Sequence, residues 1–93
     1  MSPEPETRIF TICNRRGLHA RSSAKFVKCV AEFNAVVRVR RDGQEVGGDS
    51  IMGLLMLGAA QNSEIEVLAE GPQANAVLDA LDALITGGFG EEI

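Results

Sequence analysis

Residues 7–32 read TRIFTICNRRGLHARSSAKFVKCVAE, and within them a strand pattern gives way to a helix pattern. Residues 7–13 are rich in β-formers and end at a polar loop. Residues 20–32 repeat apolar side chains at helical spacing, with basic side chains on the opposite side. The loop between them contains Gly17, which can take a positive φ that other residues avoid. This order predicts a strand followed directly by a helix.

The apolar positions of the predicted helix 20–32 cover a wide part of its surface. A helix with so broad an apolar surface is expected to pack on a sheet. One stripe is Ala20, Ala24, Val27 and Ala31, and a second set, Ser23, Phe26, Val30 and Phe33, widens it.

The remainder of the chain alternates between the same two patterns. Asp42-Gly43 is a strong hairpin signal, and Gly71-Pro72 separates the last strand from the last helix. The order β-α-β-β-α-β-α predicts an α/β fold in two layers, a four-stranded sheet with three helices on one face. After the first helix, the predicted elements are strands 35–41 and 44–47, a short helix 51–58, strand 64–70 and a helix that ends at Gly87-Gly88.

The length and composition are those of a small globular protein. A chain of 93 residues predicts a single domain over residues 1–93, with residues 1–6 and 88–93 as flexible tails. The apolar content of 45% argues against disorder. No apolar run reaches the roughly 18 residues of a membrane span, and the acidic start MSPEPE is unlike a secretion signal. We therefore expect a soluble, cytoplasmic protein without membrane insertion.

Cys13 and Cys29 are the only cysteines, and their spacing fits neither a redox pair nor a zinc site. Without a secretion signal, reduced thiols are the default state. One histidine and two separated thiols cannot complete a zinc shell unless carboxylates contribute. The sequence thus predicts no metal and no cofactor.

The charges are divided unevenly along the chain, whose formal net charge is −4. All nine basic residues lie within residues 8–41, whereas residues 42–93 carry acids and no base. The basic run is either solvated surface charge or a face around His19 that attracts an anion or an acidic partner. Nucleic acid is a weaker candidate, because the chain is acidic overall and lacks a basic-aromatic motif.

His19, the only histidine, lies just before the first predicted helix. The N-terminus of a helix offers free N–H groups and a positive dipole end, which disfavour a protonated ring and favour an arriving anion. The N–H groups of Ala20, Arg21 and Ser22 are placed to hold a phosphoryl group on the nearer ring nitrogen, Nδ1. The Arg21 guanidinium can add a charge-assisted contact. The alternatives are an ordinary polar surface residue or the base of a hydrolase, although no serine-histidine-acid order supports the latter.

Three blocks of the sequence resemble one family. The stretch NRRGLHAR at residues 14–21 resembles the phosphorylation-site signature of HPr, the phosphocarrier of the phosphoenolpyruvate:sugar phosphotransferase system. In the nitrogen-related branch of that system the carrier is called NPr. The blocks DSIMGLLML at residues 49–57 and AEG at residues 69–71 are similar to the family in order and spacing. The resemblance extends over about residues 7–89 and implies an open-faced β-sandwich with an antiparallel sheet.

This resemblance implies a specific role for His19. On this resemblance, phosphorylated enzyme I is expected to pass its phosphoryl group to Nδ1 of His19, and the protein is expected to pass it on to a histidine of an enzyme IIA. Arg21 helps to stabilise the phosphoryl group. We therefore expect a carrier that forms a phosphohistidine, not a turnover enzyme, and we expect it to act as a monomer. Because the second transfer requires an intermediate binding strength, an exposed site at a helix N-terminus suits this role better than a closed pocket.

Ser50 matches the family position that a dedicated serine kinase/phosphorylase modifies in some bacteria. It can also serve only as the N-cap of the short helix 51–58. A phosphate on Ser50 is expected to oppose docking of an acidic partner, because it adds negative charge beside the docking surface. Ile51, Met52 and Leu55 of that short helix can instead be buried in the core. The resemblance places the partner-binding surface at Ala20, Ala24, Lys28, Ile51, Met52 and Leu55.

Three positions depart from the family pattern. Ser22 stands where members commonly have proline, so the phosphate could gain a donor or the first helical turn could fray. Asn62 replaces a common glycine, a mild change because Asn tolerates a positive φ. Asp49 replaces a basic residue found in some relatives and is expected to weaken one contact with enzyme I. The absence of the proline favours the nitrogen-related branch.

A regulatory binding module is the main alternative function. In that case the protein acts by docking to kinases, transcription regulators or transporters, and phosphorylation selects among these partners. The two functions can coexist in one protein.

Overall fold

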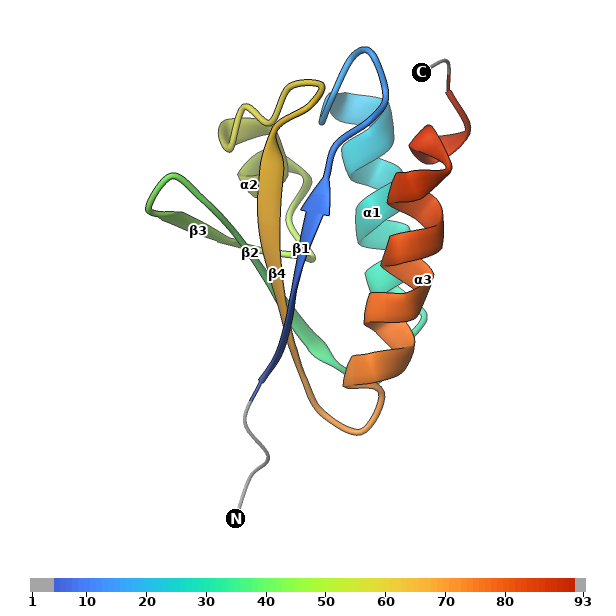
Figure 1. Ribbon diagram of the computed structural model, residues 1–93. Helices are drawn as coiled ribbons and strands as arrows, with labels where there is room; N and C mark the ends of the chain where they lie inside the picture. The colour runs from blue at the N-terminus through green and yellow to red at the C-terminus, as the bar shows by residue number, and fades with distance from the viewer. Residues whose placement is uncertain (1–4, 92–93) are drawn as a thin grey trace.

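The computed structural model describes residues 5–91 as a four-stranded antiparallel sheet covered by helices (Figure 1). This arrangement confirms the predicted order and the two-layer α/β fold. Residues 1–4 and 92–93, the outer parts of the expected tails, lie outside the described residues. The strands are β1 Glu6–Thr11, β2 Val36–Arg41, β3 Gln44–Gly47 and β4 Glu64–Glu70; the helices are α1 Ala20–Ala31, α2 Ile51–Met56 and α3 Ala74–Thr86, followed by a 3-10 turn, η1 Gly88–Gly90.

The strands lie in the order β1-β4-β2-β3, so β4 pairs with both β1 and β2 at the centre of the sheet. Val67 of β4 lies opposite Arg8 on one side and Val39 on the other. The β2–β3 hairpin closes at Asp42 and Gly43, whose φ angles of 51° and 79° are those of a type I′ turn. The Asp-Gly hairpin prediction is therefore confirmed.

One face of the sheet is covered by α1 and α3, which lie side by side, while α2 contacts α1 and the edge strand β3 (Figure 1). Strand residues such as Val39 and Val67 and helix residues such as Phe26 are fully buried between these layers. Burying one such side chain contributes about 1.5–3 kcal/mol. Among residues 5–91, no helix combines the length and apolar character needed to cross a bilayer.

The buried side of α1 differs from the prediction. The second predicted set, with Phe26 and Val30, faces the core, whereas Ala20 and Ala24 of the first stripe are exposed. The physical reason is size: a Phe side chain removes far more apolar area from water than an Ala methyl group does, so the larger residues decide which side of the helix packs.

The C-terminal segment also differs from the prediction, because residues 88–91 pack against the domain instead of forming a loose tail. The glycines that end α3 give the reason. Gly88 and Gly90 have φ angles of 65° and 74°, which turn the chain back on itself. Phe89 between them is 1% exposed, and its carbonyl accepts a 2.5 Å hydrogen bond from Lys25 Nζ. The free energy of burying this ring holds the segment in place.

Replacing Phe89 with Ala is expected to lower the free energy of unfolding by about 3–5 kcal/mol, the usual cost of truncating a buried aromatic side chain. Urea unfolding followed by circular dichroism measures this change. Met56→Ala is the control, because that side chain is 74% exposed. Equal stabilities of the two variants would show that Phe89 is not part of the core.

Candidate functional site

The loop between β1 and α1 is held against the segment that precedes β4. The Leu18 N–H donates to the Ala59 carbonyl at 2.9 Å, and the Leu18 side chain is buried. Gly17 has a φ of +64°, and a Cβ there would lie 2.3 Å from the Ala59 carbonyl oxygen. Only glycine therefore fits at this position. This close approach fixes where the chain leaves the loop and enters α1.

His19 is the N-cap of α1, as the sequence predicted from its position. Its backbone is extended, with a φ of −112°, and its carbonyl accepts the first helical hydrogen bond, from the Ser23 N–H at 2.9 Å. The Nδ1 atom of the ring accepts from the Arg21 N–H at 3.3 Å. Nδ1 therefore faces the N-terminus of the helix, where N–H groups and the dipole favour an anion.

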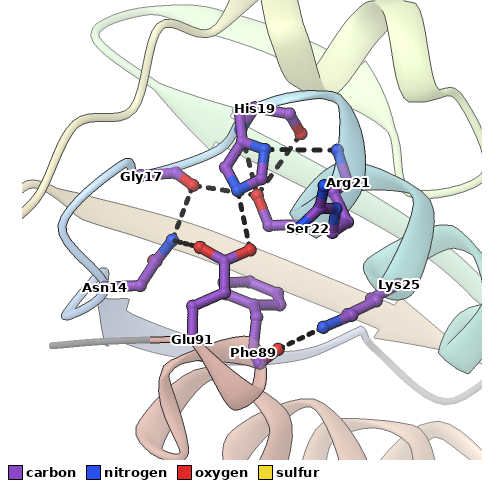
Figure 2. A network of polar contacts seen from close by, with 8 residues as sticks. All are labelled: Asn14, Gly17, His19, Arg21, Ser22, Lys25, Phe89 and Glu91. Carbon is purple, nitrogen blue, oxygen red and sulfur yellow. Dashed lines mark hydrogen bonds and ion pairs between the residues drawn. The ribbon is translucent and has the colours of Figure 1, made fainter.

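The other ring nitrogen, Nε2, contacts the C-terminal segment. It lies 2.7 Å from Oε2 of Glu91, and Oε1 of the same carboxylate accepts from Asn14 Nδ2 at 3.0 Å (Figure 2). The expectation of an exposed histidine needs correction, because the His19 side chain is only 18% exposed. The reason is the packing of Phe89, which brings the Glu91 carboxylate against Nε2 of the ring.

Ser22, in the place of the family proline, uses its hydroxyl inside the loop. The side chain is fully buried, and its Oγ accepts from the His19 N–H at 2.9 Å and donates to the Gly17 carbonyl at 2.8 Å. These bonds tie the first turn of α1 to the loop, a capping-box arrangement. These bonds oppose fraying of the first turn, which was one of the two alternatives for Ser22. In the other alternative the hydroxyl donates to a phosphate, but here it donates to the Gly17 carbonyl.

A pocket of about 380 Å³ adjoins the site on the side of the C-terminal segment. Four basic side chains line it, so part of the basic run gathers beside His19, which agrees with the second of the two interpretations of that run. Arg8 does not join them, because it pairs with Asp79 of α3 at 2.8 Å. The lining residues are Arg15, Arg16, Arg21, Lys25, Gly90 and Glu91.

The carboxyl group of Glu91 is ionised at neutral pH. Partial burial opposes ionisation, but the hydrogen bonds from Asn14 and His19, together with the nearby positive charge of Lys25, outweigh it. Together they lower the pKa of Glu91 below its ordinary value of 4.5. A fixed negative charge therefore lies beside Nε2 of His19.

The block at residues 49–57, the second that resembles the family, contains all of α2 and its two caps. Ser50 is its N-cap, and Oγ of Ser50 accepts from the Gly53 N–H at 2.9 Å. Ile51 and Met52 are exposed by 39% and 68%, whereas Leu55 is half-buried. The three predicted partner-binding residues of α1, a helix that contacts α2, are also exposed: Ala20, Ala24 and Lys28.

Asn14 and Glu91 are the site residues that the sequence analysis missed. They are 77 positions apart, and no local pattern links them. The sequence feature that could have indicated this contact was Phe89, a large apolar residue between two glycines in a segment that was predicted to be a tail.

Asn62 has a φ of 72°, as its tolerance for that angle predicted. In the described part of the chain, no three His, Cys, Asp or Glu side chains are grouped as metal ligands.

Comparisons with known proteins agree on one family. Residues 6–87 match the family described as "PTS HPr component phosphorylation site". The chain is 43% identical to phosphocarrier protein HPr of Cupriavidus necator, over 87% of this chain and 91% of that protein. It is 42% identical to phosphocarrier protein NPr of Escherichia coli, over 87% of this chain and 91% of that protein. A crystal structure of HPr-C-His from Thermoanaerobacter tengcongensis superposes with a TM-score of 0.90 at 36% identity, covering 95% of this chain and 99% of that one.

Replacing Glu91 with Gln is expected to lower stability by an amount that depends on pH. Because the pKa of Glu91 is lowered in the folded protein, its carboxylate contributes fully above the ordinary value of 4.5 and loses that contribution as the pH falls through the folded value. Urea unfolding of both proteins across this pH range measures the difference. A difference that grows on acidification would contradict the lowered pKa.

Proposed function

The chain belongs to the HPr family of phosphotransferase-system phosphocarriers, and on this basis we propose that Nδ1 of His19 accepts a phosphoryl group from phosphorylated enzyme I and passes it to a histidine of an enzyme IIA. One observation carries the proposal. Nδ1 faces the first turn of α1, where the Arg21 N–H lies 3.3 Å away. A phosphoryl group on that atom meets backbone donors and the positive end of the helix dipole.

Charge around the ring supports the same assignment. The Arg21 side chain lines the basic pocket next to His19 and can move to contact a phosphoryl group on Nδ1. These donors belong to the N-terminus of one helix and to one side chain, so we expect them to hold the phosphoryl group without enclosing it. This suits a carrier, because a group bound too tightly is not passed on.

The partners of the proposed carrier are transient. It acts as a cytoplasmic monomer that docks first on enzyme I and then on an enzyme IIA of either the sugar or the nitrogen-related branch. Relatives named HPr and NPr are similarly close to this chain, at 43% and 42% identity. Comparing the rates of transfer to the two kinds of enzyme IIA assigns the branch.

The docking surface in this proposal is the exposed part of α1 and α2. Ile51 and Met52 form an apolar centre, and Lys28 contributes a charge at the rim. Small interfaces with an apolar centre and a polar rim suit short-lived complexes. An ATP-dependent kinase that phosphorylates Ser50 is a further proposed partner, because Ser50 matches the family position that such a kinase modifies in some bacteria. The added charge would lie at the edge of this surface.

The phosphorylation of His19 has a direct test. Incubation with phosphoenolpyruvate and enzyme I is expected to add one acid-labile phosphate, measured by mass spectrometry of the intact protein. His19→Ala is expected to add none, since the chain has no other histidine. Arg21→Ala keeps the ring and the helix N-terminus and is expected to be phosphorylated more slowly than Arg21→Lys. An equal label on His19→Ala would exclude the assignment.

Ser50→Asp is expected to slow phosphoryl transfer from enzyme I by roughly tenfold, because a negative charge is added at the edge of the docking surface. Asp is a good N-cap, so α2 should stay folded. Ser50→Ala is the control: it loses about 1 kcal/mol of capping but adds no charge, and it should keep the transfer rate. Time courses of phosphoryl transfer from enzyme I give the rates for both variants. Equal rates for Ser50→Asp and Ser50→Ala would place Ser50 outside the interface.

A further inference from the structure

The two ring nitrogens of His19 have opposite kinds of neighbour. Nδ1 meets the Arg21 N–H, a donor, so Nδ1 must offer a lone pair. Nε2 meets the carboxylate of Glu91, which only accepts, at 2.7 Å, so Nε2 must carry the proton. Both contacts therefore select the same tautomer, the one in which Nδ1 is the nucleophile.

Glu91 is itself held in place (Figure 2). Asn14 donates from Nδ2 to Oε1 of Glu91 at 3.0 Å and to the Gly17 carbonyl at 2.9 Å, which ties the carboxylate to the loop that positions the histidine. The buried Phe89 lies two residues earlier. With its side chain 15% exposed, Glu91 is a fixed group that needs no rearrangement to act on the ring.

We propose that Glu91, held by Asn14, is a positioning residue that keeps His19 in the Nε2–H tautomer and stabilises the positive charge that the ring acquires when Nδ1 takes up a phosphoryl group. The inference rests on the proposed function of His19 as a phosphoryl acceptor. A carboxylate serves a histidine in the same way in serine-protease triads, where it fixes the tautomer and stabilises the imidazolium.

The transfer step balances without moving a proton on the ring. The Nδ1 lone pair forms the bond to phosphorus, and the bond from phosphorus to the donor breaks with its electron pair leaving on the donor. Nε2 keeps its proton, so the ring becomes cationic beside the Glu91 carboxylate. When the phosphoryl group moves on to the acceptor, the electron pair returns to Nδ1 and the ring is neutral again in the same tautomer. The opposite tautomer has a proton at Nδ1 and no lone pair there.

The tautomer can be observed in the free protein by ¹⁵N NMR, and the signals are unambiguous because His19 is the only histidine. At a pH where the ring is neutral, the wild type is expected to show an unprotonated Nδ1 and a protonated Nε2. Glu91→Ala should shift both signals toward a mixture of tautomers. Glu70→Ala is the matched control, since Glu70 is exposed and is the last residue of β4, whereas Glu64 at the other end of that strand pairs with Thr11 before the site loop. Unchanged signals in Glu91→Ala would overturn the proposal.

The rate of phosphoryl uptake from phosphorylated enzyme I is the second readout. Glu91→Ala is expected to be slower by about tenfold, the lower end of the cost of removing a group that orients a histidine. Glu91→Gln keeps the shape of the side chain and an acceptor oxygen but loses the charge. We therefore expect this variant to retain most of the Nε2–H tautomer while its rate of phosphoryl uptake still falls. The Phe89 ring signals report whether the segment still packs in each variant.

The two failures are distinguishable. A wild type that takes up no phosphate on His19 contradicts the proposed function, whatever the variants do. A wild type that is phosphorylated on His19, with a Glu91→Ala variant equal to it in rate and ring signals, contradicts only the positioning role.

Discussion

The close approach between the Gly17 backbone and the Ala59 carbonyl is the constraint on which the site depends. It requires a residue without a Cβ and seats Leu18 in the core, so the chain leaves the loop in the extended conformation that an N-cap needs. His19 is that N-cap. Asn, Asp, Ser and Thr are the strong caps, so a histidine here forgoes some helix stability. Local rules are broken in this way mainly at functional sites.

The site combines groups that attract a phosphoryl group with one that repels it. The N-terminus of α1 and the basic side chains of the pocket favour an anion, whereas the ionised carboxylate of Glu91, which lines the same pocket, lies against Nε2 of the ring. Repulsion between Glu91 and a phosphoryl group moderates the attraction, while the same carboxylate stabilises the cationic ring. The opposing charges are consistent with a carrier that must both accept a group and release it.

The secondary structure was largely predictable because its causes are local. Alternating side chains mark the strands, and the Asp42-Gly43 pair has the φ angles that its turn type requires. The side of α1 that is buried was predicted less well. An alanine stripe and the set containing Phe26 lie on neighbouring parts of the same helix, and only the packing against the sheet decides between them.

The sequence by itself determined the order of the elements, the place of His19 at a helix N-terminus and the resemblance to a phosphocarrier family. Tertiary structure alone decided what surrounds the second nitrogen of that histidine. Glu91 is 72 positions from His19, and their contact exists because burial of Phe89 outweighs the entropy of a free C-terminal end. That balance depends on the space between α3, α1 and the loop, which is a property of the packed molecule and leaves no periodic pattern in the chain.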